Sequence, residues 1–119
     1  MNKLSRERII NTLKGLGLSN IDIQVYIFLA KNGPHELRDV ASALKLKNRA
    51  ITRSVKDLQG MTIVTASIQH PLEFMALSFD DVINLLIEVK KEQAKAMQQS
   101  KRELLSNWRK ITKERPEKS

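Results

Sequence analysis

The sequence contains no cysteine, only four glycines and three prolines, and few aromatic residues. Without cysteine, the chain forms neither a disulfide nor a thiolate-ligated metal site. It has no run of about 18 apolar residues, which a membrane-spanning helix needs. The N-terminus lacks the apolar segment of a signal peptide. From these absences we expect a cytoplasmic protein with no membrane partner.

The motifs that mark enzymes and metal sites are also absent. There is no glycine-rich phosphate loop, serine nucleophile elbow or cysteine and histidine pair. His35 and His70 are far apart in the sequence, and neither has carboxylates at metal-ligand spacing. Asp80 and Asp81 stand at the start of a predicted helix, where carboxylates complement the helix dipole. The sequence therefore predicts a non-enzyme with no catalytic residue, no metal and no cofactor.

Positive charge is what the chain has in excess. Its 119 residues, enough for one domain, hold 21 Lys and Arg against 13 Asp and Glu, a formal net charge of +8. Such a balance favours a polyanion, either nucleic acid or an acidic membrane surface. Residues 31–60 hold seven basic against three acidic residues, whereas the long C-terminal segment mixes both signs. No strongly apolar face is set against a purely basic one in that segment, which argues against a membrane-surface helix.

Four helices are predicted before residue 61. Residues 6–14 carry an apolar face and stop near two glycines. Ser19 then caps a second helix, with Asp22 as the acid of a capping box, and Gly33 and Pro34 end it. A third helix opens at His35 or Glu36, and a basic fourth helix follows over about residues 47–60. The last two helices, tightly connected, form a helix-turn-helix pattern.

The fourth helix has two different faces. At about 100° per residue, Ile51, Val55 and Leu58 share one stripe, and the basic residues lie opposite. These residues alone favour an ordinary solvated helix face, since runs of charge are common. The elements before and after the helix reverse that preference and favour DNA recognition. The residues expected to read base edges are Arg49, Thr52 and Arg53. Those expected to bind phosphates are His35, Lys47, Asn48 and Lys56, the first through the nearby start of the third helix.

After the fourth helix the pattern becomes extended and then helical again. Residues 62–68 and 72–78 predict a β-hairpin, which is a wing when it follows a helix-turn-helix. A long helix runs from about residue 79 to 113, and residues 114–119 form a charged tail. The predicted fold is mainly α with a small β-hairpin: a winged helix-turn-helix domain with an N-terminal helix in residues 1–78, then a coiled-coil-like dimerisation helix in 79–113.

The long helix carries an apolar seam with steps of three or four residues, polar only at Gln93 and Ser100. An exposed seam of this kind favours pairing with a second copy of the chain, assisted by the N-terminal helix. The alternative is that the helix folds back on its own domain. The residues expected at the dimer interface are Ile9, Ile10, Leu13, Val82, Leu86, Val89, Met97, Leu104, Trp108 and Ile111.

The ordered set of elements resembles the TrmB-like winged helix-turn-helix transcriptional regulators of archaea, within the wider MarR-like group. The matching features are Leu16 to Ser19, Val25 and Tyr26, Gly33 and Pro34, Val40 and Ala41, Ile51, Val55 and Leu58, Ile63 and Val64, and Phe74 to Leu77. The chain departs from this family at Thr62, where glycine is usual, and in residues 61–78, which contain no Arg or Lys. The resemblance implies a transcriptional regulator.

The function predicted from the sequence is sequence-specific binding of double-stranded DNA by a homodimer, with the helix around 47–60 in the major groove. A twofold dimer predicts a palindromic operator with half-sites about 34 Å apart. The alternative is a winged-helix module that binds another protein in a transcription or replication assembly. The sequence identifies no small-molecule effector.

Overall fold

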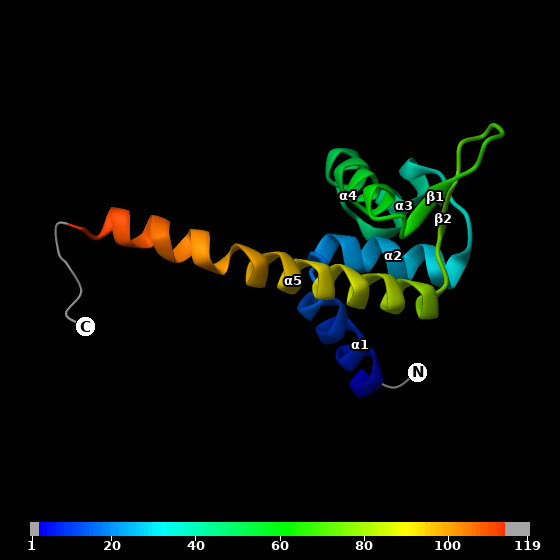
Figure 1. The fold of residues 1–119 in the computed structure, drawn as a ribbon. Helices are drawn as coiled ribbons and strands as arrows, with labels where there is room; N and C mark the ends of the chain where they lie inside the picture. Colours follow the sequence, from blue (N-terminus) through cyan, green and yellow to red (C-terminus); the bar gives the residue numbers. More distant parts are fainter. Residues whose placement is uncertain (1–2, 114–119) are drawn as a thin grey trace. The chain divides into compact units, whose positions relative to one another are not determined.

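The order of elements follows the predicted winged helix-turn-helix pattern. In a computed structural model, which describes residues 3–113, the elements are α1 (Lys3–Gly15), α2 (Asn20–Asn32), α3 (Leu37–Leu44), α4 (Asn48–Gly60), β1 (Val64–Ala66), β2 (Phe74–Ala76) and α5 (Phe79–Ile111) (Figure 1). The chain divides into two compact units, Met1–Leu86 and Ile87–Ser119. The predicted tail over 114–119 lies outside the described residues.

Helix α2 begins as its sequence predicts. The Ser19 hydroxyl oxygen accepts a hydrogen bond from the Asp22 backbone N–H at 3.1 Å, and an Asp22 carboxylate oxygen accepts one from the Ser19 N–H at 3.3 Å. These two bonds satisfy donors that the first turn of a helix leaves free. Gly33 ends the helix at φ 83°, a conformation that side chains disfavour. The capping box and the glycine stop are both confirmed.

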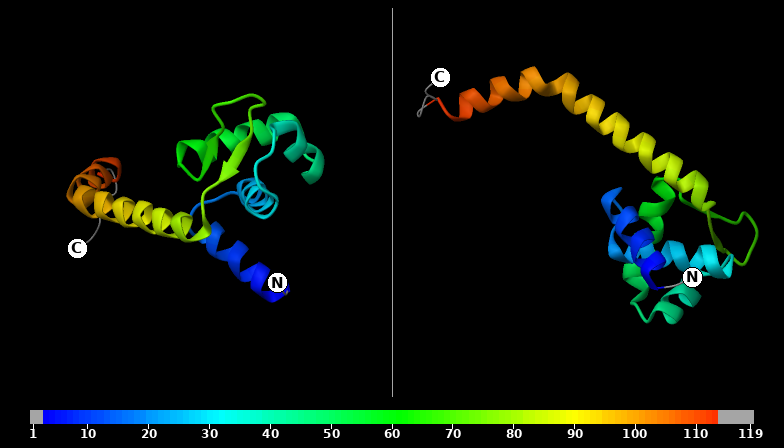
Figure 2. Two further views of the ribbon diagram at one scale, coloured as in Figure 1. Left: turned by 90° about the vertical axis from the view of Figure 1, so that its right-hand side faces the viewer. Right: turned by 90° about the horizontal axis from the view of Figure 1, so that it is seen from below.

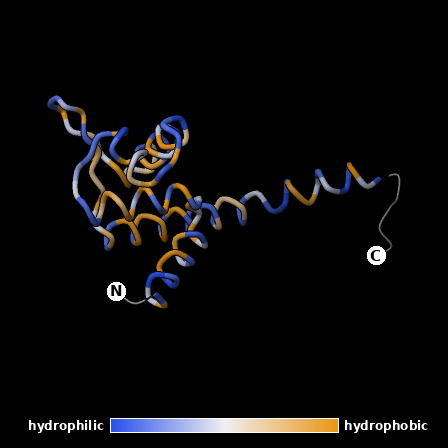
Figure 3. The backbone as a smooth tube through the Cα atoms, turned by 180° about the vertical axis from the view of Figure 1, so that it is seen from behind, coloured by the Kyte–Doolittle hydropathy of each residue, from blue (hydrophilic) through white to orange (hydrophobic). Residues whose placement is uncertain are grey.

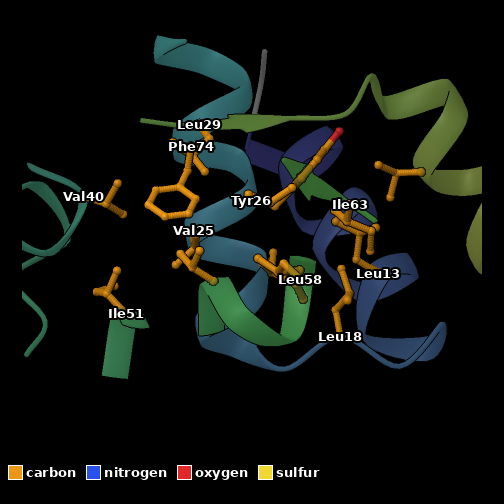
Figure 4. Close-up of a cluster of buried hydrophobic side chains, with 14 of the residues drawn as sticks. Leu13, Leu18, Val25, Tyr26, Leu29, Val40, Ile51, Leu58, Ile63 and Phe74 are labelled. Atoms are coloured by element: carbon orange, nitrogen blue, oxygen red, sulfur yellow. The ribbon is translucent and has the colours of Figure 1, made fainter. Parts of the chain in front are cut away.

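The hydrophobic core of the first unit is organised around α2, which contacts α1, α3, α4 and β2 (Figure 4). Leu13 of α1 and Val82 and Leu86 of α5 are fully or almost fully buried in this core. These three residues, expected at a dimer interface, therefore belong to the core and are not part of the proposed interface. The alternative that the long helix packs on its own domain holds for its first two turns.

The third helix begins two residues later than His35. Glu36 is the N-cap residue of α3, and His35 instead pairs with β2 as an isolated bridge. The His35 N–H donates to the Phe74 carbonyl at 3.2 Å, and the Phe74 N–H donates to the His35 carbonyl at 2.8 Å. Helix α3 ends at Lys45, which adopts a left-handed conformation with φ 56° and turns the chain toward α4.

The wing is a short antiparallel hairpin in which Thr65 pairs with Met75. Its strands are shorter than the predicted 62–68 and 72–78, because Thr62 has a left-handed backbone and Ser67 closes a turn. The Ser67 hydroxyl donates toward the Gln69 carbonyl at 3.1 Å and accepts from the Glu73 N–H at 3.0 Å. The connecting residues 67–73 form a loop beyond the paired strands (Figure 2).

Helix α5 is continuous over 33 residues, with Asp80 and Asp81 in its first turn. Every residue of α5 from Ile87 to Ile111 is exposed. Figure 3 shows hydrophobic and hydrophilic residues alternating along this part of the helix. Among residues 3–113, no helix combines the length and the hydropathy that a membrane crossing requires.

Candidate nucleic-acid interface

Helix α4 separates an apolar face from a basic face, as its sequence predicts. Ile51, Val55 and Leu58 are at most 2% exposed and hold the helix against the core. Arg49 and Arg53 are exposed on the other side. Because the apolar face is fixed by packing, the two guanidinium groups are presented to solvent from a rigid element. This arrangement suits a helix that enters a groove of DNA.

The two arginines also line an open groove of about 490 Å³ between the start of α2 and α4. Lys47 contributes a third cation, while Asp22 and Asp57 are the acids of the same groove. The remaining lining residues are Ser19, Ile21, Ala50 and Ser54. Three cations at one edge of α4 give this surface the positive charge that phosphate oxygens attract.

Asp22 connects the start of α2 to the middle of α4. The Ser54 hydroxyl donates a hydrogen bond to the second Asp22 carboxylate oxygen at 2.6 Å, and both residues are buried. A buried carboxylate needs such partners, because an unsatisfied polar group is costly away from water. Ser54 is thus a positioning residue for the candidate interface. Sequence reasoning missed it, although a serine between Ile51 and Val55 on a buried stripe was a visible signal.

The residues expected to bind phosphates fall into two groups. Lys47, Asn48 and Lys56 are exposed at the start and on the outer face of α4, and Lys47 is its N-cap residue. His35 lies elsewhere: its Nδ1 is 2.9 Å from the Gly33 carbonyl, and its ring packs edge-on against Phe28 at 5.1 Å. The backbone N–H of His35 already donates to the Phe74 carbonyl, so His35 is not part of the proposed interface. Thr52, expected to read bases, is half-buried.

The wing supplies no cationic side chain except for any charge on His70, because residues 61–78 contain no Lys or Arg. Its loop instead exposes two apolar side chains, Ile68 (fully) and Leu72 (46%). The Lys and Arg side chains of the first unit therefore all lie outside the wing.

The residues expected at a dimer interface are distributed over both units. In the second unit, Val89, Met97, Leu104, Trp108 and Ile111 are 39% to 74% exposed. In the first unit, Ile9 and Ile10 of α1 are half-buried against the core.

Ile9 lines a second groove, of about 780 Å³, between α1, α2 and the junction of β2 with α5. Tyr26 lies in its wall, and the Tyr26 hydroxyl donates to the Leu77 carbonyl at 2.8 Å. Burial raises the pKa of the Tyr26 phenol above its ordinary value. Over residues 3–113, no three His, Asp or Glu side chains come together as a metal site would require.

A family model described as "Sugar-specific transcriptional regulator TrmB" matches residues 13–80, more than half of the chain. The match begins in the last turn of α1 and ends at the start of α5, so it includes α4 and the wing. No curated protein matches the sequence.

Solved structures share the fold at low sequence identity. A possible transcriptional regulator from Methanosarcina mazei is 20% identical, over 80% of this chain and 87% of its own, with a TM-score of 0.63. YusO from Bacillus subtilis is 15% identical over 93% and 89%, with a TM-score of 0.53. A MarR-like transcriptional regulator from Thermotoga maritima is 10% identical over 95% and 96%, with a TM-score of 0.52. The shared fold is a winged helix-turn-helix followed by a long helix.

Proposed function

The chain belongs to the TrmB family, whose members are transcriptional regulators and not enzymes, and we propose that it binds double-stranded DNA sequence-specifically as a homodimer in the cytoplasm. The observation that carries this proposal is the geometry of α4. One face of the helix is locked in the core, and the opposite face exposes Arg49 and Arg53.

In the proposed complex, α4 lies in the major groove. Arg49 and Arg53 bond base edges, where a bidentate arginine to guanine contact gives roughly 1–3 kcal/mol of discrimination. Thr52 makes a lesser base contact from its half-buried position. Lys47, Asn48 and Lys56 bind phosphates at the groove margins, and these contacts set the register of the helix without reading sequence.

Two copies are needed because one α4 covers only a few base pairs. A twofold dimer presents two such helices, so the preferred site is a palindrome with half-sites about 34 Å apart, one turn of DNA. The exposed apolar residues of α5 from Val89 onward support an interface with a second copy. Regulation by a small molecule is not part of the proposal.

The test is fluorescence anisotropy with random and selected duplexes across a salt series. Wild type should bind a selected duplex tightly, with affinity that falls steeply as salt rises. Arg49→Ala with Arg53→Ala should weaken binding to the selected duplex at least about tenfold and narrow the gap between selected and random duplexes.

The matched control removes the same charge from α5, by Lys95→Ala with Arg102→Ala. This control should retain the preference for the selected duplex. If wild type binds no duplex better than about 10⁻⁴ M even at low salt, the DNA proposal is wrong.

The wing favours a second candidate function, a module that binds another protein. Ile68 and Leu72 are exposed on a hairpin without Lys or Arg, which suits an apolar contact more than a phosphate. Under this candidate, Ile68→Ser with Leu72→Ser would abolish capture of a protein partner. The wild type would have negligible DNA affinity, so the α4 substitutions would not change it.

A further inference from the structure

The spacing of the seam positions of α5 beyond Leu86 repeats every eleven residues, with polar Gln93 and Ser100 where the next repeat has Leu104 and Ile111. We propose that residues 87–111 of α5 pair in parallel, in register, with the same residues of a second copy. This inference rests on the proposed homodimer and specifies its geometry. The seam positions advance in steps of four, three and four, so that Gln93 is followed after eleven residues by Leu104, Met97 by Trp108, and Ser100 by Ile111.

The eleven-residue period determines how two such helices pack. An α-helix has 3.6 residues per turn, and an eleven-residue repeat corresponds to about 3.67, so the seam barely drifts around the helix. A pair held by this seam is therefore nearly straight or slightly right-handed, in contrast to the left-handed coil that a seven-residue repeat imposes. The continuity of α5 through Ile111 allows the seam to run without interruption.

Charged residues beside the seam indicate what covers it. Glu92 and Glu103 immediately precede seam positions, and they form what we call the acidic flank; Lys110, which precedes Ile111, is the basic residue on that side. Lys90 and Lys101 immediately follow seam positions on the opposite side, and they form the basic flank. A surface with an apolar stripe between an acidic and a basic flank is complementary to itself, which favours a second copy of this chain as the occupant.

Three of these four flanking charges have no opposite charge three or four residues away along their own helix; Glu92 has one, Lys95. Glu103 has Gln99, Ser100, Ser106 and Asn107 three and four residues away, none of them basic.

Lys90 and Lys101 likewise have no acid at those spacings. Over residues 3–113, the ion pair within α5 joins Lys91 to Glu88, an acid that precedes the seam position Val89 and so lies on the same side as the acidic flank. Glu103, Lys90 and Lys101 are therefore free to pair between copies.

The sidedness of the flanks selects the orientation. In a parallel pair, the side that precedes the seam in one helix faces the side that follows it in the other. Glu103 then faces Lys101 of the partner subunit, and Glu92 faces Lys90 of the partner subunit. In an antiparallel pair each flank faces its own kind, which brings Glu92 near the partner subunit's Glu103. Like charges so placed oppose pairing.

The test uses the absence of cysteine in the chain. Gln93→Cys and Ser100→Cys place single thiols on the seam, and each full-length variant is oxidised mildly and run on a non-reducing gel. A disulfide needs Cα atoms closer than about 7 Å. In the parallel pair both variants form disulfide-linked dimers. In an antiparallel pair, only one position of the seam lies opposite the same residue of the second copy. At most one of the two cysteine variants therefore forms a disulfide-linked dimer.

Lys95→Cys is the matched control, because residue 95 lies on the side of the helix opposite the seam. We expect it not to link. Sedimentation at the same concentrations reports the oligomeric state. A dimer in which one variant or neither links overturns the parallel arrangement. A monomer overturns both this inference and the proposed homodimer, whereas DNA reading by α4 is judged separately by the anisotropy experiment.

Charge exchange tests the flanks independently. Glu103→Lys should raise the dimer dissociation constant by about fivefold, since it sets like charges together twice per dimer. Adding Lys101→Glu should restore the wild-type value, while Lys95→Glu, a change of equal charge away from the seam, should not. Absence of restoration means that these two residues do not face each other.

Discussion

At the residue scale, Thr62 has a backbone conformation that its side chain disfavours. Its φ is 63°, in the left-handed region, and Thr is β-branched. The position follows α4 and precedes β1, so the strain is located where the chain turns from helix to wing. The TrmB-like pattern usually has glycine here, which adopts this conformation without a Cβ clash.

Thr62→Gly should therefore stabilise the protein. Relief of the left-handed strain outweighs the entropy cost of a glycine by roughly 0.5–1 kcal/mol, and urea unfolding measures the change. Thr65→Gly is the control, because Thr65 is an exposed residue in extended β1, and it should destabilise by a similar amount. A lower unfolding midpoint for Thr62→Gly would contradict this reasoning.

Tyr26 makes the free energy of unfolding depend on pH in the alkaline range. Burial raises the pKa of its phenol above 10.0, so the folded state favours the protonated form. The stability that this preference contributes is complete below pH 10 and is lost as the pH rises through the folded pKa. Tyr26→Phe should cost about 1 kcal/mol at neutral pH, because the Leu77 carbonyl loses its donor.

Thermal unfolding at neutral pH and above pH 10 distinguishes these effects. The difference between Tyr26→Phe and wild type should shrink as the pH rises, and a difference that is constant with pH would argue against the role of the phenol.

At the scale of the element, the hydrogen bonds of Asp22 make the start of α2 and the middle of α4 one assembly. One carboxylate oxygen caps α2 and the other accepts from Ser54. Helix α4 is thus held by a polar contact as well as by Ile51, Val55 and Leu58.

Ser54→Ala should destabilise the protein by roughly 1–3 kcal/mol, because it leaves a buried carboxylate oxygen without its donor. It should also weaken DNA binding several-fold without changing the slope of affinity against salt, since no cation is lost. Ser42→Ala is the control, because Ser42 is an exposed residue of α3, and it should change neither quantity. A reduced salt slope for Ser54→Ala would mean that Ser54 does not act through position alone.

The sequence predicts the helices better than the contacts between them. The α2 boundaries and the two faces of α4 follow from local signals: a capping box, a glycine and a 3.6-residue period. The positions of His35 and Ser54 depend on partners distant in sequence, Phe74 and Asp22. No residue near His35 in the chain indicates a bridge to β2, so the sequence alone predicts a helix start at this position.

At the scale of the whole molecule, the chain consists of two units that differ in how their apolar residues are covered. Met1–Leu86 buries its own core, whereas Ile87–Ile111 exposes its apolar residues. The core includes Val82 and Leu86, so the predicted boundary at residue 78 omits two turns of α5 that the first unit uses. Sequence alone did not distinguish apolar residues that the domain covers from those left exposed.

A chain truncated after Leu86 should fold and stay monomeric. Its core is complete, so circular dichroism should show cooperative unfolding, and sedimentation should show one copy at concentrations where the full chain is dimeric. Its affinity for a palindromic duplex should fall by at least about tenfold, because the second α4 is no longer tethered. A truncated chain that dimerises as tightly as the full chain would place the interface in the first unit.

The double role of Asp22 has a consequence for how such a regulator diversifies. Arg49 and Arg53, which we propose read the operator, are exposed and contribute nothing to the core. Mutations at these two positions should therefore change which operator is recognised without unfolding the protein. Ser54 is one residue from Arg53 in α4, and Asp22 lies across the groove. A change in either residue disturbs the packing of α4 against α2. Sequence change during evolution should therefore be rapid on the exposed face of α4 and slow on its buried face. New binding specificities should arise while the packing of the helix stays unchanged.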